Sequence, residues 1–250
     1  MLKIIPERFR QGYRTSAFPR REPQLSARFR GVPQIDGGKC PPTCHYCVDN
    51  CPMQAITRVA GKVVIDLGRC LFCAKCVCPH DAISFSADYR LAVRERRQLQ
   101  LSADDSLELA QPLADELRRL FGRSLKLRQV SAGGCNACEA DFNVLGVPTF
   151  DLGRFGIQVV ASPRHADGLL VTGPVTANMR AALLDTYAAL PQPRLVIVSG
   201  ACAISGGPFA ASAVAGNGVD ELLPVDLYVP GCPPHPYTLL DGLLRLLGRR

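Results

Sequence analysis

The sequence predicts two folded regions, a small α+β domain followed by a larger α/β domain with a doubly wound parallel sheet. Two observations predict this order. A duplicated cysteine motif occupies residues 40–85, whereas residues 125–250 alternate short β-branched runs with helical leucine patterns. With 250 residues, 47% of them hydrophobic, the chain is long enough to give both regions a core.

Composition narrows the class of protein. The chain has twelve cysteines and no recognisable secretory signal, which favours metal ligation in a cytoplasmic protein over disulfides. No apolar run approaches the roughly eighteen residues of a membrane span. The net charge is +7, but Trp is absent and the arginines are not interleaved with aromatic residues, so we expect no nucleic-acid partner.

Residues 1–35 are expected to form an extended docking arm. This segment has no sustained periodicity, although residues 2–9 could form a short helix that is broken at Pro6. It is also the most basic part of the chain, which suits an anionic membrane surface or an acidic partner. Disorder is the alternative interpretation. Its arginines are Arg8, Arg10, Arg14, Arg20, Arg21, Arg28 and Arg30.

Residues 36–100 contain the duplication, and both copies end in Cys-Pro-x-x-Ala-Ile. This frame is typical of a bacterial ferredoxin-like α+β domain with two 4Fe–4S clusters, in which each copy gives three cysteines to one cluster and its Cys-Pro cysteine to the other. A zinc-finger interpretation explains neither the duplication nor the Cys-Pro endings. The predicted ligand sets are Cys40, Cys44, Cys47 and Cys78 for the first cluster, and Cys51, Cys70, Cys73 and Cys76 for the second.

The spacing departs from the usual pattern at two places. Three residues separate Cys40 from Cys44, where two are usual, and one residue separates Cys76 from Cys78, where three are usual. An inserted residue can bulge outward, but the shorter spacing makes it harder for Cys78 to reach the first cluster. The sequence therefore leaves open whether that cluster is complete.

Residues 101–124 are expected to form a helical linker. Apolar residues recur at near-helical spacing from Ser106 to Phe121, and Gly122 follows as a stop signal.

Residues 125–250 predict a flavodoxin-like, doubly wound sheet. Short β-branched runs bounded by Gly or Pro are typical of buried parallel strands, and two leucine-rich or alanine-rich stretches predict helices. The expected strands are 125–130, 157–160, 169–171, 195–198 and 225–229, and the expected helices are 178–190 and 236–247.

Four further cysteines follow the predicted strands. Cys135 and Cys138 come after the first strand, Cys202 follows the strand that ends at Ser199, and Cys232 follows the strand that ends at Val229. Because ligands of such sheets bind at the carboxyl ends of the strands, we expect these thiols to converge there. A tetrahedral zinc ion or a 4Fe–4S cluster would fit four thiolates, and inert buried cysteines are the third alternative.

Residues 125–247 resemble the small subunit of membrane-bound group 4 NiFe hydrogenases and the related 20 kDa (B) subunit of respiratory complex I. The matching motifs are GCNACE (134–139), RFGI (154–157), SPRHAD (162–167), TGPVT (172–176), GAC (200–202) and VPGCPP (229–234). The resemblance implies that Cys135, Cys138, Cys202 and Cys232 hold the proximal 4Fe–4S cluster. In the complex I subunits the first two of these four cysteines are adjacent. In this chain they are Cys135 and Cys138, and their Cys-x-x-Cys spacing is similar to that of the hydrogenase branch.

Residues 1–100 resemble the two-cluster ferredoxin subunit of formate hydrogenlyase and complex I, including TSAFP (15–19) and FRGVP (29–33) in the arm. The resemblance implies a fusion of two electron-transfer subunits, with three 4Fe–4S clusters and no complete catalytic site of its own. It implies a NiFe large subunit, complex I-like membrane subunits and an upstream dehydrogenase or ferredoxin as partners, at the inner face of the cell membrane.

Two other functions stay open at this stage. One is the equivalent subunit of a nickel-free quinone or sulfur reductase, and the other is a zinc-binding assembly module. Proton movement near a partner is a possible role for Glu139 and Asp141, and the resemblance places Arg164 and His165 in a loop facing the membrane arm. For all four residues the alternative is an ordinary surface or structural side chain.

Overall fold

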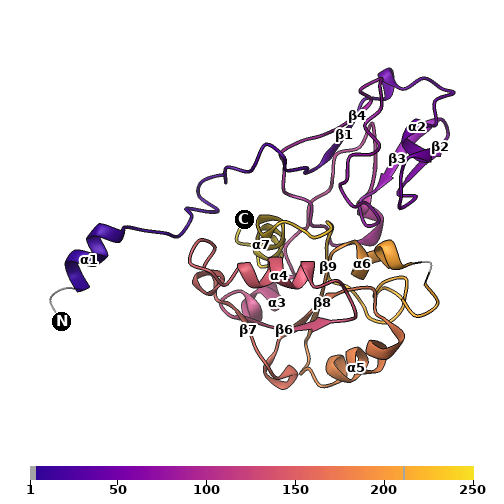
Figure 1. The fold of residues 1–250 in the computed structure, drawn as a ribbon. Coiled ribbons are helices and arrows are strands. Elements are labelled where there is room, and N and C mark those ends of the chain that lie inside the picture. The colour runs from indigo at the N-terminus through magenta and orange to yellow at the C-terminus, as the bar shows by residue number, and fades with distance from the viewer. Residues whose placement is uncertain (1–3, 211) are drawn as a thin grey trace.

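A five-stranded parallel sheet forms the centre of the C-terminal half of the chain (Figure 1). The computed structural model describes residues 4–210 and 212–250. The strand order is β7-β6-β8-β9-β10, which is the 2-1-3-4-5 order of a flavodoxin-like sheet. The strands are β6 (Leu125–Ser131), β7 (Ile157–Val159), β8 (Gly168–Thr172), β9 (Leu195–Ser199) and β10 (Leu227–Val229). The predicted parallel sheet is therefore confirmed.

Helices cover both faces of this sheet. Alternate strand residues point to opposite faces, so Leu170 packs with helices α4 (Ala137–Val144) and α7 (Pro236–Leu246), whereas Leu169 packs with α5 (Ala177–Ala188) and α6 (Ala201–Ser205). Burial of both faces is the reason why these strands are continuous apolar runs. Short 3₁₀ helices η3 (Leu152–Phe155), η4 (Pro163–His165) and η5 (Gly207–Phe209) lie in the connections.

Small antiparallel sheets form the N-terminal half, as an α+β region requires. One sheet joins β2 (Ile56–Val59), β3 (Lys62–Asp66) and β5 (Gln100–Ser102), and the other pairs β1 (Pro33–Ile35) with β4 (Ile83–Phe85). A two-residue turn connects β2 to β3, and both of its residues have positive φ, 50° at Ala60 and 80° at Gly61. Helix α2 (Tyr46–Asp49) and 3₁₀ helices η1 (Gly37–Lys39) and η2 (Arg96–Leu99) complete this half.

The basic arm divides into a projecting helix and a docked segment. Helix α1 (Ile4–Gln11) projects from the body with no buried residue, and Pro6 lies in its first turn, where a missing N–H is tolerated. From Ser16 onward the arm contacts the C-terminal half: the Ser16 N–H donates to Thr149 O at 2.9 Å, and Arg154 donates to Phe18 O at 2.8 Å. The first three residues of the predicted arm, 1–3, lie outside the described residues.

The predicted linker helix is much shorter than expected. Helix α3 covers only Asp115–Phe121, and the stretch from Ser106 to Ala114 is not helical. Pro112 disfavours a helical conformation in the residue before it and cannot donate an N–H bond. The flanking N–H groups donate elsewhere, from Ala110 to Ala92 O at 2.8 Å and from Leu113 to Leu246 O at 2.9 Å. The leucine pattern over 106–114 reflects burial against other elements and not a helix.

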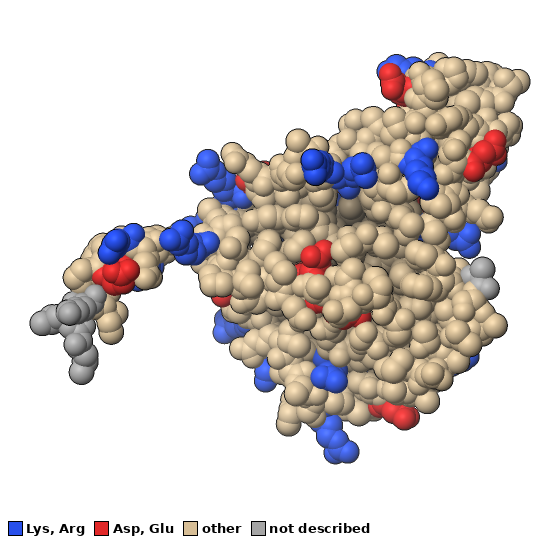
Figure 2. Space-filling view, in the orientation of Figure 1, with Lys and Arg blue, Asp and Glu red and all other residues tan. Residues whose placement is uncertain are grey.

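Direct contacts join the two halves. The Ser205 hydroxyl donates to Gly68 O at 3.0 Å, and Val93 and Tyr228 exchange two main-chain hydrogen bonds of 3.0 and 2.9 Å. Lys and Arg side chains are dispersed over the face shown in Figure 2, without one continuous basic patch. Within the described residues, the helices are all too short or too polar to cross a membrane.

Replacing Phe18 tests the docking of the arm. Phe18 is 3% exposed and packs on Tyr237 with ring centroids 5.2 Å apart, so Phe18→Ala should lower the free energy of unfolding by about 3 kcal/mol. Phe9 in the projecting helix is 84% exposed, and Phe9→Ala should change it by less than about 0.5 kcal/mol. Urea denaturation measures both, and equal effects would contradict the described docking.

Candidate functional site

Four cysteines meet at the carboxyl edge of the parallel sheet. Cys135 lies in the loop after β6, Cys138 in the first turn of α4, Cys202 in α6 after β9, and Cys232 in the loop after β10. Burial raises the pKa of Cys202 to about 11, and repulsion from Cys232 and Cys135 contributes. Burial likewise raises the pKa of Cys138, with contributions from Glu139 and then from the three other thiols. The structure thus brings this predicted set together.

Glycine is required where the loop after β9 passes this group. Gly200 has φ +91°, and a Cβ at this position would lie 2.5 Å from Cys138 Sγ. Gly173, with φ +83°, similarly leaves space for the main-chain N of Gly134, which would be 2.5 Å from an added Cβ. The two glycines let neighbouring loops approach the thiols closely.

A second group of four thiols lies in the N-terminal half. Cys51, Cys70, Cys73 and Cys76 line one cavity, and apolar side chains that include Ile56, Ile65 and Phe85 complete its wall. Burial is the main reason why the pKa of Cys70 rises to about 12 and that of Cys76 to about 11. Two sulfurs accept main-chain hydrogen bonds, Cys51 Sγ from the Ala55 N–H at 3.2 Å and Cys70 Sγ from the Phe72 N–H at 3.3 Å.

The remaining group in the N-terminal half includes Cys78, and the sequence left open whether this residue lies close to the others. Burial raises the pKa of Cys47, and so does repulsion from Cys40, Cys44 and Cys78. Cys47 and Cys78 are buried, with exposed fractions of 4% and 6%. Despite the short Cys76–Cys78 spacing, Cys78 therefore lies near Cys47.

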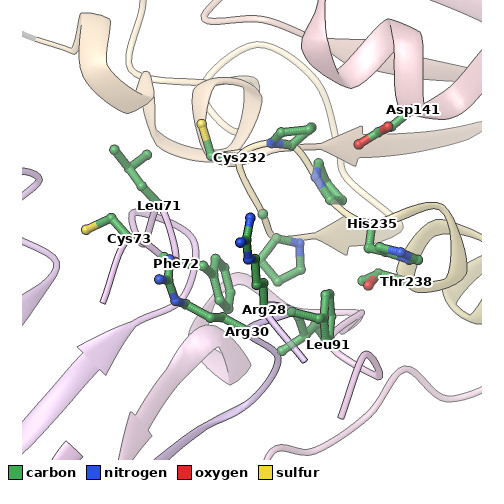
Figure 3. Close-up of a pocket in the computed structure, with 15 residues that line it drawn as sticks. Arg28, Arg30, Leu71, Phe72, Cys73, Leu91, Asp141, Cys232, His235 and Thr238 are labelled. Atoms are coloured by element: carbon green, nitrogen blue, oxygen red, sulfur yellow. The ribbon is translucent and has the colours of Figure 1, made fainter. Parts of the chain in front are cut away.

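The three groups follow one another in space. Cys47 contributes to the raised pKa of Cys76, after burial and the nearer thiols Cys51 and Cys73, so the two N-terminal groups are neighbours. Cys73 and Cys232 both line an open cleft of about 400 Å³ between the two halves of the chain. Figure 3 shows that the thiols of Cys73 and Cys232 point away from the cleft, in different directions. Each of the two cysteine loops therefore lines the cleft with the side opposite to its thiol.

The sequence did not predict that several residues of this cleft lie there. Arg28 and Arg30 reach it from the arm, and Arg30 donates to Phe72 O at 3.2 Å, next to Cys73. His235 also lines the cleft; burial lowers its pKa, and its Nδ1 accepts a hydrogen bond from the Tyr237 N–H at 3.1 Å. Arm, loop and helix start are far apart in sequence, so only the folded chain brings these residues together.

The four other candidate residues lie in two parts of the structure, Glu139 and Asp141 in helix α4 and Arg164 and His165 in η4. Glu139 is buried; burial opposes its ionisation, but hydrogen bonds from Ser131 and Thr172 hold its pKa below the usual value. Asp141 lines the cleft, where burial raises its pKa. Arg164 and His165 are exposed in η4, which precedes β8, so they lie away from the sheet edge that carries the cysteines.

The donor set of each group consists of thiols alone. The described residues contain no disulfide among the twelve cysteines, and no three His, Cys, Asp or Glu side chains there are spaced to hold a single metal ion. A 4Fe–4S cluster is larger than one ion and takes one thiolate at each of four irons. Three groups of four thiols match that requirement in number and in chemistry.

Comparison with known proteins identifies the family. The family model for the 20 kDa subunit of NADH ubiquinone oxidoreductase matches residues 135–246. A probable membrane-bound hydrogenase subunit from Pyrococcus furiosus is 41% identical over 132 residues, which are 53% of this chain and 79% of that protein. The chain belongs to the family of the 20 kDa subunit of NADH–ubiquinone oxidoreductase.

Two further relatives represent both branches of this family. Formate hydrogenlyase subunit 7 from Escherichia coli is 46% identical over 132 residues, 53% of this chain, and the chain spans only 52% of the length of that relative. The B subunit of NADH-quinone oxidoreductase from Heliobacterium modesticaldum is 44% identical over 116 residues, 46% of this chain and 66% of the relative. The family match begins at Cys135 and does not extend to the two N-terminal cysteine groups.

Substitution of Gly200 tests the packing around Cys138. Gly200→Ala combines an unfavourable backbone conformation with a contact on sulfur, so it should lower the free energy of unfolding by about 3 kcal/mol or more. Gly61 has a similar φ of +80° with no atom within 4 Å of an added Cβ, so Gly61→Ala should cost only about 1 kcal/mol. Urea denaturation of the iron-free chain measures the free energy of unfolding of both variants. If Gly200→Ala and Gly61→Ala lowered it equally, the close contact between position 200 and Cys138 would be excluded.

Proposed function

We propose that this chain is an iron–sulfur electron-transfer subunit of a membrane-associated, formate hydrogenlyase-like NiFe hydrogenase complex. The observation that carries the proposal is the series of three four-thiol groups, which runs from the N-terminal half to the carboxyl edge of the sheet. A 4Fe–4S cluster, when bound, accepts and donates single electrons. Each group then serves as one station of a relay.

The N-terminal groups form the bacterial ferredoxin-like part of this relay. Cys40, Cys44, Cys47 and Cys78 would hold the first cluster, and Cys51, Cys70, Cys73 and Cys76 the second. This assignment is supported by the proximity of Cys78 to Cys47 and by the cavity that the second set lines. The wall of that cavity includes the apolar side chains Ile56, Ile65 and Phe85, and main-chain N–H groups that donate to the sulfurs of Cys51 and Cys70 stabilise negative charge there.

The third group connects the relay to a partner. Cys135, Cys138, Cys202 and Cys232 would hold the proximal cluster, and Cys135 and Cys232 are exposed, so that a large subunit can approach this edge. Electrons would enter from an upstream dehydrogenase or ferredoxin and leave to a NiFe site in that large subunit. The proposed location is the cytoplasmic face of the membrane, bound through complex I-like membrane subunits.

The sequence identity of this chain to members of both branches of the family supports a second candidate function. The 44% identity to an NADH-quinone oxidoreductase component fits a nickel-free complex that reduces quinone or sulfur. Nickel analysis of the complex co-purified with this chain separates the two, because the nickel ligands belong to the large subunit. The Cys135-x-x-Cys138 spacing, shared with the hydrogenase branch, favours the first candidate.

Metal analysis of the anaerobically purified chain tests the relay itself. Three clusters of four irons predict about twelve irons and as many acid-labile sulfides per chain. Loss of the first cluster alone would leave about eight irons. Zinc without iron or sulfide would contradict the proposal and support a zinc-binding assembly module.

Single cysteine variants assign the groups. Cys232→Ala should reduce the iron content to about eight per chain and abolish electron transfer to the large subunit, while the signals of the two N-terminal clusters persist in electron paramagnetic resonance (EPR) spectra. Cys78→Ala should remove a different signal, that of the first cluster, at the same iron content. Retention of partner-linked activity in Cys232→Ala would refute the assignment of the third group.

A further inference from the structure

The spacer between Cys40 and Cys44 is folded into a turn. It contains one residue more than the spacer between Cys70 and Cys73 in the second copy. The Cys44 N–H donates to Pro41 O at 3.0 Å, which closes a four-residue β-turn with Pro42 at its second position. The extra residue is thereby accommodated, but the turn lies on the surface, where Cys40 and Cys44 are only partly buried.

Arg58 contacts this turn from β2. Its Nη1 donates to Pro41 O at 3.3 Å and to Cys44 O, and its Nη2 donates to Gly61 O at 3.1 Å in the β2–β3 turn. One guanidinium therefore joins the first carbonyl of the turn, the last carbonyl of the turn and the adjacent hairpin. The planar fork of Arg suits this bridging role, whereas the ammonium of Lys is a single point of contact.

The hydrogen bonds of the Arg58 guanidinium all go to main-chain carbonyl oxygens. The side chain is half-buried, and in the described parts of the chain it takes part in no ion pair, although Lys39 and Lys62 nearby are both paired with carboxylates. Arg58 and Cys40 also line the same open cleft. A positive charge thus lies beside the first thiol group without a neutralising partner.

We propose that Arg58 is a positioning residue that holds the enlarged Cys40–Cys44 turn in the conformation needed to bind the first cluster, and that its charge raises the reduction potential of that cluster. This inference rests on the proposed function. Fixing both ends of the turn keeps Cys40 and Cys44 near Cys47. A cation beside the group favours the reduced, more negative form of the cluster.

The test compares Arg58→Gln and Arg58→Lys with Arg97→Gln in the full-length chain, loaded anaerobically. Arg97 is 82% exposed and paired with Glu95 in the same half, so it is a matched control. Chelator-induced loss of the first cluster should be about tenfold faster in Arg58→Gln, because hydrogen bonds from a charged donor are lost. The other two cluster signals, monitored by EPR, should decay as in the wild type.

The Arg58→Lys variant distinguishes the two proposed effects of Arg58, the fixing of the Cys40–Cys44 turn and the effect of its positive charge on the reduction potential. Arg58→Lys should lose the first cluster about as fast as Arg58→Gln, because a point charge cannot bridge the carbonyls, but the remaining cluster should keep a reduction potential close to the wild type in an EPR titration. In Arg58→Gln that potential should fall. Decay rates and potentials equal to those of Arg97→Gln would overturn the inference, whereas absence of iron from the wild-type chain would instead overturn the proposed function.

Discussion

The crowding of thiols is the constraint on which the rest of this structure depends. Burial is the main cost of ionising these thiols, and neighbouring sulfurs add to that cost when more than one of them is ionised. Isolated loops would not hold several thiols close together. The chain holds them there by fixing each cysteine loop to a rigid element, either the end of a buried strand or a short turn next to a β-hairpin.

The parallel sheet solves this problem for the C-terminal group. Its strands all point the same way, so the loops after β6, β9 and β10 meet at one edge. Gly173 and Gly200 then let those loops approach more closely than any side chain would permit. Membership of the 20 kDa subunit family is consistent with this geometry, because the family match covers the segment that contains all four cysteines.

The interface between the two halves gives the groups a fixed order. The Ser205–Gly68 hydrogen bond and the Val93–Tyr228 bridge join the two halves. Electron transfer along the proposed relay needs short separations between the groups, and these contacts hold the two halves against each other. The docked arm strengthens the same arrangement, since Arg30 reaches from it to the loop of Cys73.

The sequence by itself determined the parallel strands and the two helices α5 and α7, because periodicity is a local property. Motif spacing, which is also local, is the basis of the proposed division of the twelve cysteines into groups. The sequence misjudged the segment from Ser106 to Ala114, where leucines are buried by distant elements such as Ala92 and Leu246. Only the tertiary structure decided that Cys78 lies near Cys47, and that Arg28, Arg30 and His235 share a cleft with Cys73 and Cys232. Those contacts join segments far apart in the chain, and no local pattern encodes which distant surfaces will pack together.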